Sequence, residues 1–150
     1  MKKLLLILLM VILYCSCEKK DEIVDITNQC IFPEDNYKPC YSISADTIII
    51  QDTNTYYNVF NTNNLTNYNC DTVSLPDIDF NTYSLLGILT IGSGCSADYK
   101  RKIFKDISNK KIIYSISIEY SGLCEMLIYN WNFTLVPKVP DEYTVDFQLE

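Results

Sequence analysis

The sequence predicts a mainly β fold, a small antiparallel β-sandwich or barrel-like domain with one short helix and a disulfide bridge. Three observations lead to this fold class. From Phe80 onward, apolar and polar residues alternate over several segments, as in strands with one buried face. Turn signals separate these segments. Two of the segments also end beside a glycine and a cysteine.

The first sixteen residues have the parts of an export signal. Met1, Lys2 and Lys3 form a basic start, and 4–13 is an uninterrupted apolar run of ten residues. A helix of that length spans about 15 Å, half of the ~30 Å hydrocarbon layer. We therefore expect a signal peptide over 1–16 and not a membrane span. A buried N-terminal helix and cleavage without lipid are the alternatives.

The segment 13–17, Leu-Tyr-Cys-Ser-Cys, resembles the bacterial lipobox, in which a small residue precedes the acylated cysteine. Cys17 is therefore predicted to carry acyl chains such as palmitate, and more than one chain makes an anchor stable. The charged stretch 18–22 resembles the signal that sends Bacteroidota lipoproteins to the outside of the outer membrane. We expect a lipid-anchored, surface-exposed protein, with periplasmic display as the alternative.

The predicted organisation is a signal peptide at 1–16, a tether and irregular lead-in at 17–43, and a β-rich globular domain at 44–150. Without Lys2 and Lys3 the mature chain has 10 basic and 19 acidic residues, a net charge of −9. This balance argues against a nucleic-acid partner, because such binding depends on neutralising phosphates. We expect the membrane and another envelope protein as partners.

Most of the remaining positive charge is concentrated in one short stretch. A solvated hairpin is one interpretation, and a docking patch for an acidic partner or for phosphates is the other. The candidate patch consists of Lys100, Arg101, Lys102, Lys105, Lys110 and Lys111.

Export places the cysteines in an oxidising compartment, where disulfides are expected. With Cys17 acylated, five remain: Cys30, Cys40, Cys70, Cys95 and Cys124. Their spacing is not that of a zinc site, and an odd number leaves at least one unpaired. The pair that we favour is Cys95 with Cys124, because each ends a predicted strand beside a glycine.

The elements of the domain are predicted in chain order as follows. A strand begins at Thr47, and Asp52 or Thr53 then caps one short helix that contains Tyr56, Tyr57 and Phe60. Residues 61–74 form an Asn-rich loop. The apolar run 85–91 is a central buried strand, and 106–109 is a turn between two later strands.

Three later segments alternate strictly, and we expect their apolar sides to face the core. The apolar positions are Tyr114, Ile116, Ile118 and Tyr120; Tyr129, Trp131, Phe133 and Leu135; and Tyr143, Val145, Phe147 and Leu149. A carbohydrate-binding platform formed by the aromatic residues of these stripes is the alternative to core packing.

The order of short motifs over about residues 46–149 resembles the small lipoprotein domains grouped with the protease-complex subunit PrcB. The motifs are Leu75-Pro76-Asp77-Ile78-Asp79-Phe80, Gly92-Ser93-Gly94-Cys95, Gly122-Leu123-Cys124-Glu125-Met126 and Leu135-Val136-Pro137-Lys138. The resemblance implies a β-rich accessory subunit or binding module without catalytic residues.

Several kinds of catalytic chemistry have no residues to support them. The sequence has no histidine, which excludes Ser-His and Cys-His nucleophile systems. No cofactor or metal site is predicted. The leading hypothesis is thus a non-enzymatic binding or accessory module of an envelope complex. The alternatives are a carboxylate-dependent carbohydrate hydrolase that uses pairs such as Asp77 with Asp79 or Glu119 with Glu125, and an inhibitor of exported proteases that inserts 98–111 or 61–74.

Overall fold

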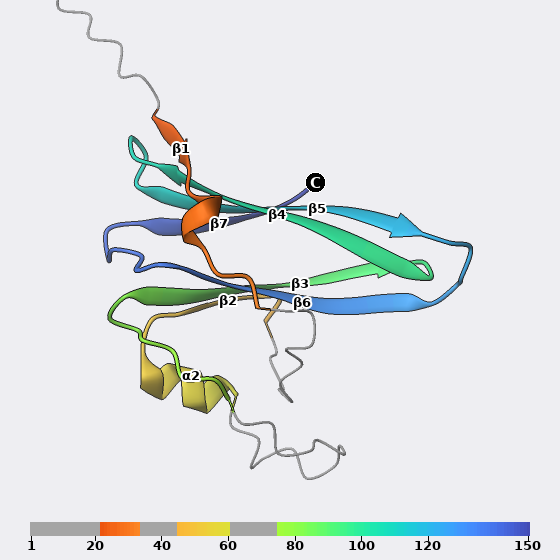
Figure 1. Cartoon of the computed structure of the whole chain (residues 1–150), viewed down its shortest axis with the longest axis horizontal. Coiled ribbons are helices and arrows are strands. Elements are labelled where there is room, and N and C mark those ends of the chain that lie inside the picture. The colour runs from red at the N-terminus through yellow and green to blue at the C-terminus, as the bar shows by residue number, and fades with distance from the viewer. Residues whose placement is uncertain (1–21, 34–44, 61–74) are drawn as a thin grey trace, which may run out of the picture.

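The computed structural model describes residues 22–33, 45–60 and 75–150. Two sheets lie face to face, one ordered β1-β4-β5-β7 and the other β2-β3-β6 (Figure 1). The strands are β1 (Ile23–Asp25), β2 (Thr47–Ile50), β3 (Tyr83–Ser93), β4 (Ser96–Asp106), β5 (Lys111–Ser121), β6 (Leu127–Pro137) and β7 (Thr144–Leu149). The predicted mainly β, sandwich-like fold is confirmed.

The predicted buried strand is β3, the central strand of its sheet, between β2 and β6. Its two faces meet different partners. Leu86 and Ile88 belong to the core between the sheets, whereas Leu85 packs on the opposite face. The core between the sheets consists of Ile26, Leu86, Ile88, Ile103, Ile112, Tyr114, Ile116, Val136 and Val139.

The helix α2 (Thr53–Val59) covers the outer face of the three-stranded sheet (Figure 1). Asp52 is its N-cap, as expected, and its Oδ1 accepts a hydrogen bond from the backbone N–H of Thr55 at 2.8 Å. This bond satisfies one of the amide groups that the first turn leaves unpaired. Tyr56 and Phe60 are buried and form a second core with Leu85 and Phe133.

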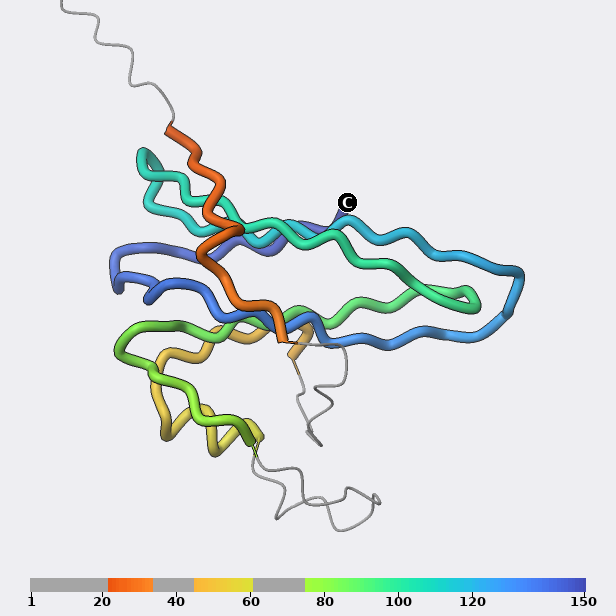
Figure 2. Tube along the Cα trace, in the orientation of Figure 1, coloured from red at the N-terminus to blue at the C-terminus, as the bar shows by residue number. Residues whose placement is uncertain are grey.

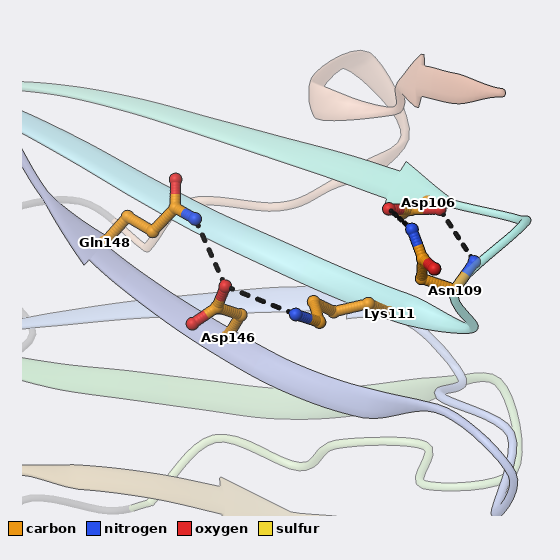
Figure 3. A network of polar contacts seen from close by, with 5 residues as sticks. All are labelled: Asp106, Asn109, Lys111, Asp146 and Gln148. Carbon is orange, nitrogen blue, oxygen red and sulfur yellow. Dashed lines mark hydrogen bonds and ion pairs between the residues drawn. The ribbon is translucent and has the colours of Figure 1, made fainter. Parts of the chain in front are cut away.

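The predicted turn after β4 is also confirmed, and Figure 3 shows its contacts. The carboxylate of Asp106 accepts hydrogen bonds from the backbone N–H of Asn109 at 2.9 Å and from its side-chain amide at 2.8 Å. These bonds lower the pKa of Asp106. The turn closes the β4–β5 hairpin, and β7 then pairs with β5 in parallel. The predicted antiparallel arrangement is therefore wrong for β7, because a connection that returns the chain from β6 to the other sheet brings β7 alongside β5 in the same direction.

The predicted irregular lead-in is wrong for residues 22–33, which we call the strap. Here β1 pairs with β4, Ile26 is buried between the sheets, and Ile31 bridges to Leu135 on β6. The strap thus crosses from one sheet to the other (Figure 2). The domain includes this stretch, which lies before the predicted boundary at 44. The predicted loop at 61–74 lies outside the described residues.

The strand β6 is turned opposite to the expected orientation. Asn132 and Thr134 are completely buried, and the side chain of Asn132 contacts Arg101 of the other sheet. The polar side of β6 therefore faces the space between the sheets. Its aromatic side faces outward, where Phe133 is buried under α2. The alternation was predicted correctly, but not the direction of its two sides.

Candidate functional site

One end of the sandwich consists of two ribbons of two strands each, β3 with β6 and β4 with β5, which we call the distal arm (residues 91–102 and 117–129). It begins where β1, β2 and β7 stop pairing with their neighbours. Beyond that point β3 pairs only with β6, and β4 only with β5, among the residues that the structure describes. Figures 1 and 2 show the two ribbons extending away from α2 and the strap.

The outer face of the ribbon formed by β3 and β6 is apolar and exposed. Ile91 is 54% exposed, and Leu127 and Tyr129 are each 62% exposed. Ile91 and Tyr129 are cross-strand neighbours in the β3–β6 ladder. Closer to α2 the same side of β6 is buried at Phe133. The arm therefore carries an apolar stripe that continues from a covered core onto an uncovered surface. Exposed apolar patches of this kind mark interaction sites.

Both ribbons also have open backbone edges. Ile31 and Leu135 exchange two backbone hydrogen bonds, at 2.9 and 2.8 Å. Because alternate residues of a strand direct their N–H and C=O groups to the same edge, those of Leu127 and Tyr129 point to that same side. No residue in 22–33, 45–60 or 75–150 pairs with them. Such an edge is a template for another strand.

The disulfide between Cys95 and Cys124 joins the two connections at the tip of the arm, with Cα atoms 4.9 Å apart. The predicted pair is confirmed. Gly122 has a φ of 84°, a conformation that favours glycine, and a side chain there would collide with the sulfur of Cys95. The neighbouring Leu123 is fully exposed. The tip is thus held covalently and presents an apolar residue to its surroundings.

No protein-family model, curated protein or solved structure matches this chain. The resemblance to PrcB-like domains therefore stays a prediction.

The six cations of the predicted docking patch do not share one face. Lys100 and Lys102 lie on the outer face of β4, and Lys100 forms an ion pair with Glu119. Arg101 lies on the inner face and donates to Asn132 at 3.2 Å. Arg101 differs from its two neighbours because successive side chains of a strand point to opposite faces of the sheet. The other three lie near the turn at the opposite end of the hairpin: Lys105, Lys110 and Lys111.

Those three cations make separate contacts. The ammonium of Lys105 lies 5.1 Å from the ring centre of Tyr143. Lys110 is a turn residue with a φ of 50°. Lys111 lies 3.8 Å from the carboxylate of Asp146 (Figure 3). The outward pair Lys100 and Lys102 is therefore the part of the predicted patch that belongs to the arm.

Next to this pair, the outer face of β4 and β5 has a groove of about 260 Å³. Its lining combines cations, hydroxyl groups, one aromatic ring and a carboxylate. Inside it, Ser115 donates a hydrogen bond to the side chain of Glu150 at 2.9 Å. A carboxylate of the chain itself thus already occupies a position beside the lysines. The lining residues are Lys100, Lys102, Phe104, Ser115, Ser117 and Glu150.

A polar cluster that the sequence analysis missed lies between the sheets at the base of the arm. The side-chain amide of Asn132 donates to Thr90 at 3.0 Å, while its oxygen accepts from Arg101. The hydroxyl of Tyr99 is buried and has no hydrogen-bond partner among the described residues. Polar residues occupy every second position from 130 to 134. This pattern was the sequence signal for the cluster, because a row of polar side chains faces either solvent or a second sheet.

The carboxylates considered for hydrolysis have local partners. Asp79 accepts from the hydroxyl of Thr82 at 2.6 Å and from the backbone N–H of Asn81 at 3.0 Å, and these bonds lower its pKa. Glu119 forms the ion pair with Lys100. These contacts stabilise a turn and a hairpin, respectively.

Several predicted features lie outside the described residues: the signal peptide, Cys17 with its lipid, Cys40 and Cys70. Cys30 of the strap is a free thiol. Across the described ranges, no helix is long and apolar enough to cross a membrane. The same ranges contain no group of three or more residues suited to holding a metal ion.

Proposed function

We propose that this chain is a lipid-anchored, non-enzymatic binding module of the bacterial envelope. In this proposal Cys17 fixes it to the outer membrane, facing the cell surface, and the distal arm docks another envelope protein. The chain then serves as an accessory subunit of a protein complex. The observation that carries the proposal is the uncovered apolar stripe of the arm, Ile91, Leu127 and Tyr129.

The open edges of the arm favour a protein partner over the bilayer. In hydrocarbon, each unsatisfied backbone N–H or C=O group costs several kcal/mol, so open sheet edges avoid lipid. A protein strand, by contrast, satisfies these groups directly. Leu127 and Tyr129 combine exposed apolar side chains with backbone groups that point to the free edge.

An accessory role fits the chemistry of the chain better than catalysis does. Histidine is absent from the whole sequence, which removes the usual general base. The carboxylates of Asp79 and Glu119 have partners within the fold. The arm instead offers apolar side chains, backbone groups and lysines, which are means of recognition.

The proposal is tested by quantitative affinity purification from detergent-solubilised envelopes of the native host. The wild type is compared with Tyr129→Glu on the arm and with Tyr57→Glu on α2. Tyr57 is 49% exposed, so it is a matched control for adding charge at an exposed tyrosine. We expect a specific protein to be lost with Tyr129→Glu and retained with Tyr57→Glu. Equal recovery with both variants, or turnover of a substrate by the isolated chain, would overturn the proposal.

The anchor has its own test. Cys17→Ser removes the acylated thiol, and we expect the chain to leave the membrane fraction while its β domain stays folded. Mass spectrometry of the N-terminal peptide should show the acyl chains on Cys17 in the wild type. Unchanged membrane fractionation of the variant would contradict the anchoring.

A further inference from the structure

We infer that two copies of this chain associate by antiparallel pairing of their β7 strands, which joins their sheets into one continuous sheet. β7 lies at one edge of the four-stranded sheet, and β1 lies at the other edge. This surface is separate from the distal arm. The inference therefore goes beyond the proposed function and does not depend on it.

The backbone hydrogen bonds of β7 show which residues face the open edge. The N–H groups of Thr144 and Glu150 donate to carbonyls on the β5 side, at 3.0 and 2.9 Å, so the even-numbered residues pair with β5. By the alternation within a strand, the backbone groups of Val145, Phe147 and Leu149 point away from β5. No residue in 22–33, 45–60 or 75–150 pairs with them. Each of the three therefore offers one donor and one acceptor to another strand.

The layer between the sheets is incomplete beside this edge. Val145 and Phe147 pack against the core between the sheets, and Leu149 follows them on the same face. Leu149 is nevertheless 55% exposed. On the facing sheet, Ile49 is the cross-strand neighbour of the buried core residue Leu86, yet it is 44% exposed. Both inward-facing side chains lack the next strand that would cover them.

A groove of about 450 Å³ lies at this margin, between β2 and the start of β7. Ile49 lines it from one sheet and Val145 from the other. A strand added beside β7 would cover the groove if it placed an apolar side chain next to Val145. The other lining residues are Gln51, Val139, Pro140, Asp141, Tyr143 and Thr144.

Charge disfavours two of the ways in which two β7 strands can pair. Edge-facing residues must meet one another in an antiparallel pair, so three registers pair at least two of them from each copy. When Val145 meets Phe147, the two Asp146 carboxylates lie opposite each other. When Phe147 meets Leu149, Asp146 lies opposite Glu150. Like charges directly opposite each other destabilise a sheet.

The third register centres on Phe147, which then meets its own counterpart in the second copy. Here Asp146 lies opposite Gln148, and Glu150 lies opposite Thr144. The side-chain amide of Gln148 already donates to Asp146 of its own strand at 3.1 Å (Figure 3), and a carboxylate can accept several such bonds. This register also makes the most hydrogen bonds, because all three edge-facing residues of each copy are paired.

The same register brings the exposed apolar side chains together. Leu149 of the second copy lies opposite Val145, whose side chain lines the groove together with Ile49. By two-fold symmetry, Leu149 of the first copy reaches the groove of the second copy. Each copy thus supplies the apolar side chain that covers the open margin of the other.

The acids on the outer face of β7 oppose this association in part. Asp146 of one copy lies diagonally from Asp146 and Glu150 of the other, at about 7–8 Å. Lys111 lies 3.8 Å from Asp146 (Figure 3) and offsets some of the repulsion. Association should therefore strengthen as salt is added, because salt screens exposed charges at this distance.

Sedimentation equilibrium of the full chain in density-matched detergent measures the self-association. We expect a dimer, and Leu149→Glu should weaken it at least tenfold by placing a charge at the groove. The matched control is Ile23→Glu, because Ile23 is 54% exposed on β1 at the opposite edge of the same sheet. Gln148→Glu sets a second acid against Asp146 and should weaken the dimer severalfold, and adding Asp146→Asn should restore it.

Cysteine substitutions test the register. Asp146 and Gln148 of the second copy form a non-hydrogen-bonded pair with Cα atoms about 4.5 Å apart, which is within the range of a disulfide. Co-expressed Asp146→Cys and Gln148→Cys chains should therefore give a cross-linked dimer on non-reducing electrophoresis. Each variant expressed alone should give no more cross-linked dimer than the wild type, which controls for the native cysteines.

Three results would overturn the inference. The first is a monomeric wild type, which would leave the edge of β7 to a strand of another protein. The second is a dimer that Leu149→Glu does not weaken, which would place the contact on another surface. The third is cross-linking of either single variant alone, which would mean a different register. The proposed function has its own test in Tyr129→Glu, so it can fail or survive independently of all three.

Discussion

The two ends of this sandwich are stabilised in different ways. At the proximal end, α2, two sheets and the strap enclose two cores, and large side chains such as Leu86, Tyr114 and Phe60 are fully buried. In the distal arm, Gly94 is the only buried residue of the described segments 91–102 and 117–129. The arm depends on backbone ladders and on one disulfide at its tip. Regions with few buried apolar contacts open locally at low free energy, and binding surfaces are drawn from such regions.

The largest expected contrast is between two identical substitutions. Leu86→Ala removes a completely buried side chain between the sheets and should lower the free energy of unfolding by about 2–5 kcal/mol. Leu127→Ala, at 62% exposure on the arm, should change it by less than about 0.5 kcal/mol. Urea denaturation of both variants measures the contrast. Similar losses would mean that the arm is packed as tightly as the proximal core.

The disulfide at the tip of the arm is the next largest effect. Replacing both Cys95 and Cys124 by serine opens a loop of sequence separation 29, which should cost about 3–4 kcal/mol in the chain-entropy picture. Amide exchange should accelerate in the core, because the free energy of global unfolding falls, and most strongly in 91–102 and 117–129, where the tip is no longer held covalently. Cys30→Ser is the control, because it removes a thiol that is not part of a bridge. Exchange that accelerates evenly over the whole domain would break the distinction between the two ends.

Two glycines of β3 give a smaller and more local contrast. A methyl group at Gly87 would lie 2.8 Å from the ring of Phe133, which is held in the proximal core, so Gly87→Ala should cost about 1–3 kcal/mol. At Gly92 the methyl group would collide with the outer end of Tyr120. Tyr120 is 37% exposed and can turn away, so Gly92→Ala should be nearly neutral. Thermal unfolding of the two variants compares them, and equal destabilisation would show that Tyr120 is fixed.

Local sequence patterns were sufficient for the elements whose structure is decided locally. The cap at Asp52 and the turn at 106–109 depend on hydrogen bonds within four residues, so the sequence contains all the atoms involved. The pair Cys95 and Cys124 was predictable because each follows a strand end next to a glycine. The apolar run in β3 indicated a strand with both faces covered.

The features that the sequence did not predict depend on packing between residues far apart in the chain. Alternation in β6 separates an aromatic side from a polar side, but it does not say which side meets the second sheet. α2 covers the aromatic side at Phe133, so Asn132 faces Arg101 across the interior, and the hydroxyl of Thr134 donates to the carbonyl of Ile31 in the strap. The same period of two placed Lys100 and Lys102 on the face opposite Arg101. The three-residue strand β1 is exposed along its length, so it left no burial pattern to detect.

The smallest expected effect tests whether the strap belongs to the proximal end. Burial and the nearby charge of Asp25 raise the pKa of the Cys30 thiol to about 11, compared with about 8.5 for a free cysteine. Above pH 8.5 the unfolded chain loses this proton first, so the thiol's contribution to stability falls as the pH rises toward 11.

Urea titrations of the wild type and Cys30→Ser at pH 7.5 and 10 isolate that contribution. Groups that titrate alike in both proteins cancel, and burial, the main cause of the raised pKa of Tyr114, is common to both. The stability of the wild type relative to the variant should decrease at the higher pH, and native Cys30 should react slowly with iodoacetamide at pH 8. Equal pH dependence together with rapid alkylation would mean that the strap opens as readily as the arm. The proximal end would then begin at the sheets and α2 alone.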